Sequence, residues 1–145
     1  MDNKQLVRRY LEGVFSKHDL ALIDETMSSD FVEYQNYDSS GEKPIKGREE
    51  WKKVVQMFLS AFPDLQSDII DLIAEGDKVA CRWISRGTHK GTYMGVAPTN
   101  KLVTIPGISF FRIVNGKIVE GRASWDMIGC LTQLGALPIQ FKKAA

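Results

Sequence analysis

The sequence is poor in the residues that build disulfide and metal sites. Its only cysteines are Cys81 and Cys130, which lie far apart with no second pair. This excludes a disulfide framework and a paired-cysteine zinc site, so we expect two reduced thiols, each a small core residue. The only histidines, His18 and His89, have no acidic cluster of ligand spacing near them. We therefore expect no metal and no other cofactor.

Long apolar runs and an excess of one charge are also missing. No apolar run approaches the roughly 20 residues that cross a bilayer, and the first residues lack the pattern of a secretory signal. The formal net charge is +1, whereas nucleic acids and anionic membranes attract clustered cations. We expect a cytoplasmic protein without nucleic-acid or membrane partners. Its 145 residues suit one domain spanning residues 1–145.

The first part of the sequence carries helical patterns. Apolar residues recur at helical spacing over residues 6–15, which predicts an amphipathic helix. Asp19 is placed to cap a second, shorter helix that runs through Met27, because its carboxylate can accept backbone N–H groups. The clearest apolar stripe covers residues 51–62, and Pro63 ends it by removing a backbone donor.

The second part of the sequence carries strand patterns. It is rich in β-branched and aromatic residues between turn signals. The expected strands are residues 65–74, 78–88, 102–114 and 117–125. Residues 75–77 and the pair Asn115-Gly116 are hairpin turn signals, so neighbouring strands should be antiparallel.

Three shorter features complete the expected fold. A short strand is expected at residues 30–34, a loop at residues 36–47 and a last helix at residues 127–134. Helices that precede a block of strands are typical of α+β proteins. We therefore predict a cone-shaped, curved, mostly antiparallel sheet packed against three N-terminal helices, enclosing an apolar pocket.

A series of short motifs runs along nearly the whole chain in a fixed order. They are Asp30-Phe31-Val32, Ala61-Phe62-Pro63-Asp64, Glu75-Gly76-Asp77, Gly87-Thr88-His89-Lys90-Gly91, Gly95-Val96-Ala97-Pro98-Thr99-Asn100-Lys101, Asn115-Gly116-Lys117-Ile118-Val119-Glu120, and Asp126-Met127-Ile128-Gly129 with Gln133-Leu134-Gly135. Their order resembles the SnoaL-like polyketide cyclases of the ester cyclase type. This family belongs to the superfamily of ketosteroid isomerase, scytalone dehydratase and nuclear transport factor two.

The resemblance implies a catalytic role for Asp126. It matches the aspartate that the cyclases of anthracycline biosynthesis use as an acid/base in an intramolecular aldol condensation. The reaction needs no metal, because a carbon between carbonyls is already acidic and a desolvated carboxylate can remove its proton. We therefore expect a cofactor-free lyase or isomerase that acts on a small, hydrophobic, carbonyl-bearing compound.

Asp126 also has a purely structural interpretation. Aspartate is a favoured N-cap, and a helix is expected to start at residue 127. Strict alternation places Glu120, Arg122, Ser124 and Asp126 on one face of the last strand. That polar stripe could line the pocket, or it could face water or a partner subunit.

Seven further residues are candidate substrate contacts. They are Tyr34, Gln35, Arg82, His89, Phe110, Arg112 and Arg122. Tyr34 and Gln35 stand where many members of the resembling family carry His or Asn at the pocket. His89 could bond a substrate oxygen, although its segment has the composition of a turn. Phe110 and Arg112 replace polar residues of the anthracycline cyclases, which argues for a different substrate.

Other functions remain open at this stage. A hydrolase, dehydratase or isomerase could use the same cone, with Arg82 and Asp126 activating water, although Arg82 could equally form an ordinary ion pair. A non-catalytic carrier or dimerising module is the alternative outside enzymology, because one fold can host both enzymes and binders. The open sheet and the resembling cyclases imply a homodimer or a homotetramer.

Overall fold

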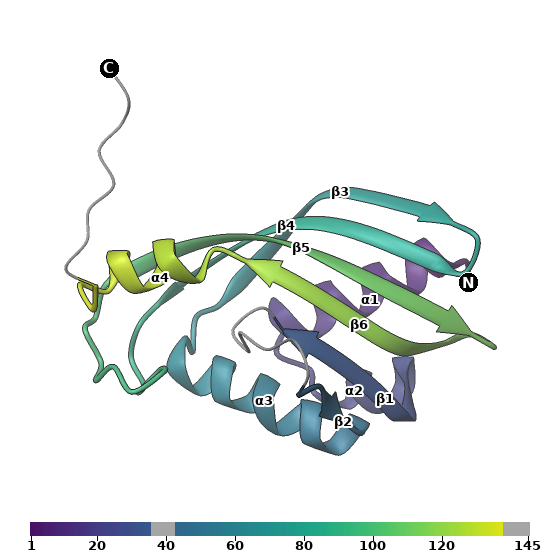
Figure 1. Ribbon diagram of the computed structural model, residues 1–145, viewed down its shortest axis with the longest axis horizontal. Helices are drawn as coiled ribbons and strands as arrows, with labels where there is room; N and C mark the ends of the chain where they lie inside the picture. Colours follow the sequence, from purple (N-terminus) through teal and green to yellow (C-terminus); the bar gives the residue numbers. More distant parts are fainter. Residues whose placement is uncertain (36–42, 138–145) are drawn as a thin grey trace.

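The computed structural model describes residues 1–35 and 43–137 (Figure 1). Part of the expected loop, residues 36–42, lies outside the described residues. In chain order the elements are α1 (Asn3–Phe15), α2 (Ala21–Thr26), β1 (Met27–Gln35), β2 (Ile45–Lys46), α3 (Arg48–Ala61), β3 (Gln66–Glu75), β4 (Lys78–Thr88), β5 (Leu102–Val114), β6 (Lys117–Trp125) and α4 (Met127–Gln133).

Acidic side chains accept backbone hydrogen bonds at the starts of the first two helices. Asp2 forms a capping box with Gln5, in which each side chain accepts a hydrogen bond from the backbone N–H of the other, so two otherwise unpaired donors are satisfied. The carboxylate of Asp19 accepts from the backbone N–H of Ala21 at 3.1 Å. The N-cap of α2 is however Leu20, without a side-chain hydrogen bond, and the helix ends at Thr26. The predicted N-cap at Asp19 and the predicted end at Met27 are therefore each off by one residue.

Helix α3 is longer at its N-terminus than its apolar stripe predicts. It begins at Arg48 after Gly47, whose φ of 97° is in the left-handed region that favours glycine. Trp51 and Val55 are buried one turn apart and face the core. The helix ends at Ala61, two residues before Pro63, as the missing backbone donor of proline requires.

The strands form one mixed sheet in the order β2-β1-β6-β5-β4-β3. All neighbouring strands are antiparallel except β1 and β6, which are parallel. The turn between β5 and β6 has positive φ at both central residues, 51° at Asn115 and 72° at Gly116, as the predicted tight hairpin requires.

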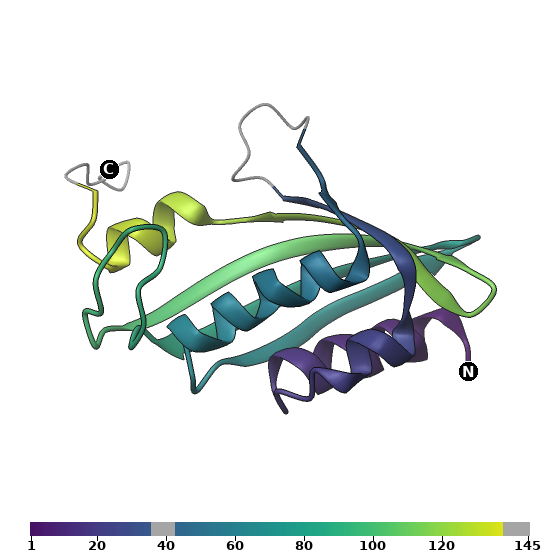
Figure 2. The same ribbon diagram turned by 90° about the horizontal axis from the view of Figure 1, so that it is seen from below.

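Helices α1 and α3 lie across the same face of the curved sheet (Figure 2), and the core fills the space between them and the strands. Helix α4 follows β6 at the opposite end of the sheet from the β5–β6 turn (Figure 1). The predicted α+β fold, with a curved sheet packed against three N-terminal helices, is confirmed. In the part of the chain that the structure describes, no helix is long and apolar enough to cross a membrane.

Candidate functional site

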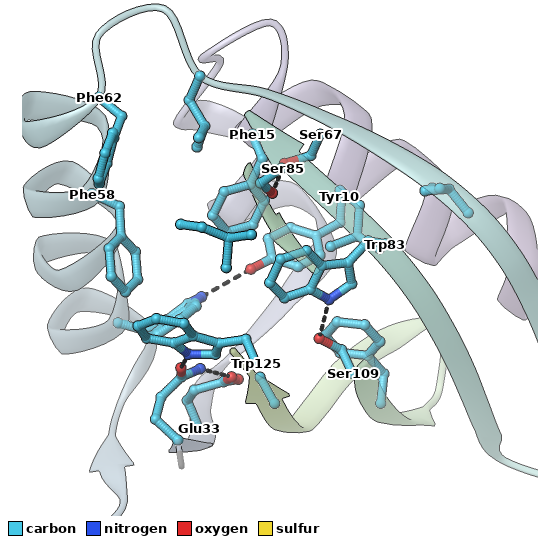
Figure 3. A pocket seen from close by; sticks show the side chains of 18 of the residues that line it. Tyr10, Phe15, Glu33, Phe58, Phe62, Ser67, Trp83, Ser85, Ser109 and Trp125 are labelled. Atoms are coloured by element: carbon cyan, nitrogen blue, oxygen red, sulfur yellow. Dashed lines mark hydrogen bonds between the residues drawn. The ribbon is translucent and has the colours of Figure 1, made fainter. Parts of the chain in front are cut away.

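A pocket of about 110 Å³ lies between helices α1 and α3 and the inner face of the sheet (Figure 3). Its walls come from every layer of the fold. It is lined by Tyr10, Leu11, Phe15, Glu33, Gln35, Trp51, Phe58, Phe62, Leu65, Ser67, Ile69, Trp83, Ser85, Tyr93, Ile105, Ser109, Phe111, Ala123 and Trp125. The expectation of an apolar pocket inside the cone is met.

Aromatic rings make up much of the pocket wall. Tyr10 meets Phe15 and Phe111 edge to face, with both pairs of ring centroids 5.8 Å apart. Tyr93 packs against Phe58 and Phe62 at centroid distances of 5.9 and 5.3 Å. These arrangements suit the charge distribution of aromatic rings, and they leave flat apolar surfaces exposed to a ligand.

Glu33 alone carries a carboxyl group among the lining residues that the structure describes. Its side chain is only 3% exposed. Oε1 accepts a hydrogen bond of 2.5 Å from Nε2 of Gln35, whereas Oε2 has no partner among the described residues. Burial raises the pKa of Glu33 to about 8, because desolvation disfavours the charged carboxylate. Near neutral pH this group can both give and take a proton.

Tryptophan side chains hold the polar groups of the pocket in place. Nε1 of Trp125 donates to Oε1 of Gln35 at 3.0 Å, and Gln35 in turn donates to Glu33. The other two indoles donate to hydroxyl groups: Trp51 to Tyr10 at 3.0 Å and Trp83 to Ser109 at 2.9 Å (Figure 3).

Tyr10 remains protonated in this setting. Burial, and secondly the charge of Glu33, raise the pKa of Tyr10 well above its usual value of 10.0. Ser67 and Ser85 add a further polar pair to the pocket, with hydroxyl oxygens 2.5 Å apart. The pocket is thus mostly apolar, with a few fixed polar groups, which is typical of small-molecule sites.

Asp126 lies outside this pocket. It is exposed, and its carboxylate accepts from the backbone N–H of Gly129 at 2.8 Å as the N-cap of α4. Of the two interpretations of Asp126, the structure supports the capping one, and a catalytic role for Asp126 inside the pocket does not fit this position. Alternation on β6 turns Ala123 and Trp125 toward the pocket, so Ser124 and Asp126 point to the other face.

The polar stripe predicted on β6 exists, and it faces outward. The guanidinium of Arg122 lies 3.9 Å from the ring centroid of Tyr34 on β1. Glu120 forms ion pairs with Arg122 at 3.0 Å and with Arg112 at 3.9 Å. None of these side chains lines the pocket, so Tyr34, Arg112 and Arg122 are corrected as substrate contacts inside it.

Two candidates on the neighbouring strands also face outward. Arg82 pairs with Asp71 at 2.6 Å, and Phe110 is 52% exposed. Arg82 and Asp126 border the same hollow on the outer face, but no ion pair joins them in the described part of the chain. A water-activating pair of these two residues is therefore not formed.

His89 and Gln35 are both at least partly buried, but only Gln35 reaches the pocket. The His89 ring packs 5.6 Å from that of Phe62, behind the pocket wall. Its Nδ1 accepts from the backbone N–H of Thr99, so the hydrogen of the neutral ring lies on Nε2. His89 therefore helps to fix the loop after β4.

The cysteines are free and buried, as expected. Burial raises the pKa of the Cys81 and Cys130 thiols to about 11, so neither is poised as a nucleophile. Among the described residues, no group of three or more His, Cys, Asp and Glu side chains could hold a metal ion.

Sequence reasoning missed the central carboxyl group. Glu33 lies between Phe31 and Gln35 on the inward face of β1. Alternation along β1 places this acidic residue on the same strand face as a phenylalanine that is expected to be buried. Because a buried carboxyl group is costly, that pattern could have marked Glu33 as a candidate site residue. Tyr10 and Ser109 gave no comparable signal, because their positions suit ordinary core or surface residues.

Comparisons with known proteins agree with this geometry. The family model described as SnoaL-like polyketide cyclase matches residues 4–134. AclR of Streptomyces galilaeus, named as a candidate hydroxylase, is 32% identical, with 95% of this chain and 85% of AclR covered and a TM-score of 0.80. IdmH of Streptomyces antibioticus, named as a candidate polyketide cyclase, is 30% identical, with coverage of 92% and 99% and a TM-score of 0.77.

A third structure, from Jannaschia sp. CCS1, is named as a candidate SnoaL-like polyketide cyclase. It is 23% identical, with 92% of each chain covered and a TM-score of 0.83. At this identity the likeness concerns the fold. None of the curated proteins matches the chain.

Proposed function

Because the chain belongs to the SnoaL-like polyketide cyclase family, we propose that it is a cofactor-free acid/base enzyme acting on a small apolar carbonyl compound. The reaction we propose is an intramolecular aldol condensation, with Glu33 in place of Asp126 as the group that moves the proton. The observation that carries this proposal is the buried Glu33 carboxyl group, whose Oε2 is unpartnered within the described residues and lies at an aromatic pocket.

The proposed chemistry follows from the environment of Glu33. In its ionised form the carboxylate removes a proton from the carbon next to a substrate carbonyl, which leaves an enolate. The enolate carbon then forms the new carbon–carbon bond with a second carbonyl of the same molecule. The protonated carboxyl returns its proton to the resulting alkoxide, so the cycle closes without net gain or loss of protons. A pKa of about 8 suits both steps near neutral pH.

Exchange of carbon-bound hydrogen for deuterium tests the first step without the natural substrate. With 2-tetralone in D₂O, we expect the protein to accelerate exchange next to the carbonyl, as followed by NMR. The rate should rise with pH toward about 8, as the carboxylate form of Glu33 accumulates. The Glu33→Gln substitution should lower the rate of exchange at least about 10²-fold, which is the usual contribution of a general base.

Asp126→Asn is the matched control. It removes one carboxylate on the outer face and retains a side-chain oxygen for the helix cap, so exchange should continue at the unaltered rate. Equal rates for the unaltered protein and Glu33→Gln would refute the role of Glu33. Binding of 2-tetralone without any exchange would instead favour a non-catalytic binding module.

A further inference from the structure

Strands β1 and β6 bring Trp125, Gln35 and Glu33 together at one wall of the pocket. Glu33 and Gln35 lie two residues apart on β1, so both side chains point to the inner face. Ala123 stands opposite Gln35 in the parallel pairing of the two strands, and its small side chain lets the Trp125 indole reach Gln35. Trp125 and Glu33 thus lie at the two ends of a short chain of hydrogen bonds (Figure 3).

The Trp125 indole fixes which way the amide of Gln35 points. An indole N–H can only donate a hydrogen bond, and this one donates to Oε1 of Gln35 at 3.0 Å. The amide nitrogen of Gln35 is therefore turned toward Glu33, and it donates to Oε1 of the carboxyl group at 2.5 Å. A flipped amide would set its NH₂ group against the indole N–H. Two donors that face each other away from water lose hydrogen bonds without replacing them.

The orientation of this amide matters for the protonation of Glu33. An amide N–H stabilises the ionised carboxylate, whereas an amide oxygen stabilises the protonated carboxyl group, because it accepts from the O–H. Burial raises the pKa of Glu33 to about 8, and the hydrogen bond from Gln35 acts in the opposite direction. The amide as oriented thus favours the form that removes a proton from a substrate carbon.

We infer that Trp125 is a positioning residue of the proposed reaction. Its indole N–H holds the Gln35 amide with the nitrogen toward Glu33, and in this way it favours the ionised carboxylate. Trp125 exchanges no proton itself and acts through Gln35. This inference rests on the proposed function in taking Glu33 as the acid/base group.

Uncharged side chains surround these three residues in the described part of the pocket wall. Tyr10 on α1 and Tyr93 in the loop after β4 are the other titratable groups that line the pocket. Burial, and secondly the charge of Glu33, keep Tyr10 protonated by raising its pKa. Helix α3 and strands β3 to β6 contribute no charged side chain to the described wall. Replacement of Trp125 by phenylalanine therefore leaves the charges around Glu33 unaltered.

Carbon-13 NMR of protein labelled at the glutamate carboxyl carbons follows Glu33 directly, because its signal is the one missing from Glu33→Gln. In the unaltered protein this signal should titrate with a midpoint of about 8. Trp125→Phe keeps an aromatic ring but removes the N–H, so the Gln35 amide can turn. The midpoint should then rise by about one pH unit, the size of one hydrogen bond to a charged group. Exchange of 2-tetralone at pH 7 should fall about tenfold and recover at higher pH.

A double variant separates this relay from a packing effect of Trp125. Gln35→Met keeps the length of the side chain without its amide, so it removes the donor to Glu33 and should itself raise the midpoint. In that background Trp125→Phe should add nothing, because its effect passes through the amide. A packing effect would add equally in both backgrounds. Trp83→Phe is the matched control, since its indole donates to Ser109 and its loss should not raise the midpoint.

The indole N–H signals test the relay without any change at Trp125. In nitrogen-15 NMR spectra, the Trp125 signal should shift with the same midpoint as the Glu33 carboxyl carbon, because linked hydrogen bonds polarise one another. The signal of the Trp83 indole should shift far less, since its hydrogen bond ends at Ser109.

Three results would overturn the inference. These are a midpoint in Trp125→Phe that is unchanged or lower, equal shifts by Trp125→Phe in both backgrounds, and a Trp125 indole signal that does not follow Glu33. The outcome is separable from that of the exchange experiment. If Glu33→Gln exchanges normally but the carboxyl titrations behave as expected, only the acid/base proposal fails. If Glu33→Gln abolishes exchange and the shifts add in the double variant, only the present inference fails.

Discussion

Gly121 lies directly opposite Glu33 in the parallel pairing of β1 and β6, and the space of its missing side chain is occupied by the Glu33 carboxyl group. A Cβ atom at Gly121 would stand 2.1 Å from Glu33 Oε2, closer than non-bonded atoms approach. The buried carboxyl group and the glycine therefore form one structural unit across two strands.

The first prediction concerns this unit. Gly121→Ala should push the Glu33 carboxyl group out of position, because the new methyl group competes for its space. We expect deuterium exchange of 2-tetralone to fall by at least tenfold, since small displacements of a reacting group are costly. The free energy of unfolding, from urea titration, should fall by about 1–3 kcal/mol, as overpacking does.

Gly107→Ala serves as the comparison for that variant. A Cβ there would come within 2.3 Å of the Trp83 ring, which is bulkier and more rigid than a glutamate side chain. It should therefore cost more stability than Gly121→Ala. Full exchange activity in folded Gly121→Ala would show that the position of the Glu33 carboxyl group does not matter for proton transfer.

The second prediction is a pH dependence of stability. The pKa of Glu33 is raised from 4.5 to about 8 in the folded protein, so the folded state holds this proton more tightly than the unfolded state. The contribution of this proton to the free energy of unfolding is fully present below pH 4.5 and is lost as the pH rises through 8. Each pKa unit corresponds to about 1.4 kcal/mol, so several kcal/mol should be lost across this range.

Chemical unfolding between pH 5 and pH 9 measures this loss. Glu33→Gln is neutral at every pH, so its stability should decline less over the same range, and it should exceed the unaltered protein at pH 9. Parallel curves for the two proteins would contradict a buried, neutral Glu33.

The third prediction separates the structural role of Asp126 from catalysis. Asp126→Ala removes the acceptor for the Gly129 N–H and should lower the free energy of unfolding by about 1 kcal/mol, the usual value of an N-cap. Asp126→Asn should restore most of that loss. Both folded variants should retain deuterium exchange. A loss of exchange in Asp126→Asn would return the catalytic role to the outer face of the sheet.

The fourth prediction concerns the outer face of the sheet, where Ile108 and Phe110 on β5 are 48% and 52% exposed. Arg82 and Arg122 border them with their acidic partners Asp71 and Glu120. Positively and negatively charged side chains thus flank one apolar centre. The face can therefore match a second copy of itself across a two-fold axis. We therefore expect a homodimer through this face.

Light scattering coupled to size-exclusion chromatography measures the oligomeric state. Phe110→Glu should yield a monomer, because it buries an unpaired charge in the interface. Met57→Glu is the control, since Met57 is 50% exposed on α3, away from the outer face. A monomeric unaltered protein, or a dimer that survives Phe110→Glu, would contradict the prediction.

Local signals in the sequence predicted the fold well. The apolar stripe of residues 51–62 and the stop at Pro63 anticipated α3, and Asn115-Gly116 anticipated the β5–β6 hairpin. These predictions succeeded because helix periodicity and turn geometry are determined by residues that lie close together in the sequence. Alternation likewise grouped Arg122 and Asp126 on one face of β6.

The candidate site was predicted less well, and Asp126 and Glu33 show why. The two-residue alternation of a strand tells which side chains share a face, but it does not tell which of the two faces is buried. That choice depends on where α1 and α3 pack, because they cover the face that carries Glu33, Ser109 and Trp125. With the other face open, Asp126 is left to cap α4.

The sequence by itself therefore determined the order of helices and strands, the family and the presence of an apolar interior, because these depend on local pattern and composition. Only the tertiary structure decided which carboxyl group is desolvated. Desolvation depends on atoms from strands and helices distant in the chain, including the vacancy at Gly121 and the aromatic walls of α1 and α3. That long-range packing gives Glu33 its chemistry and leaves Asp126 in solvent.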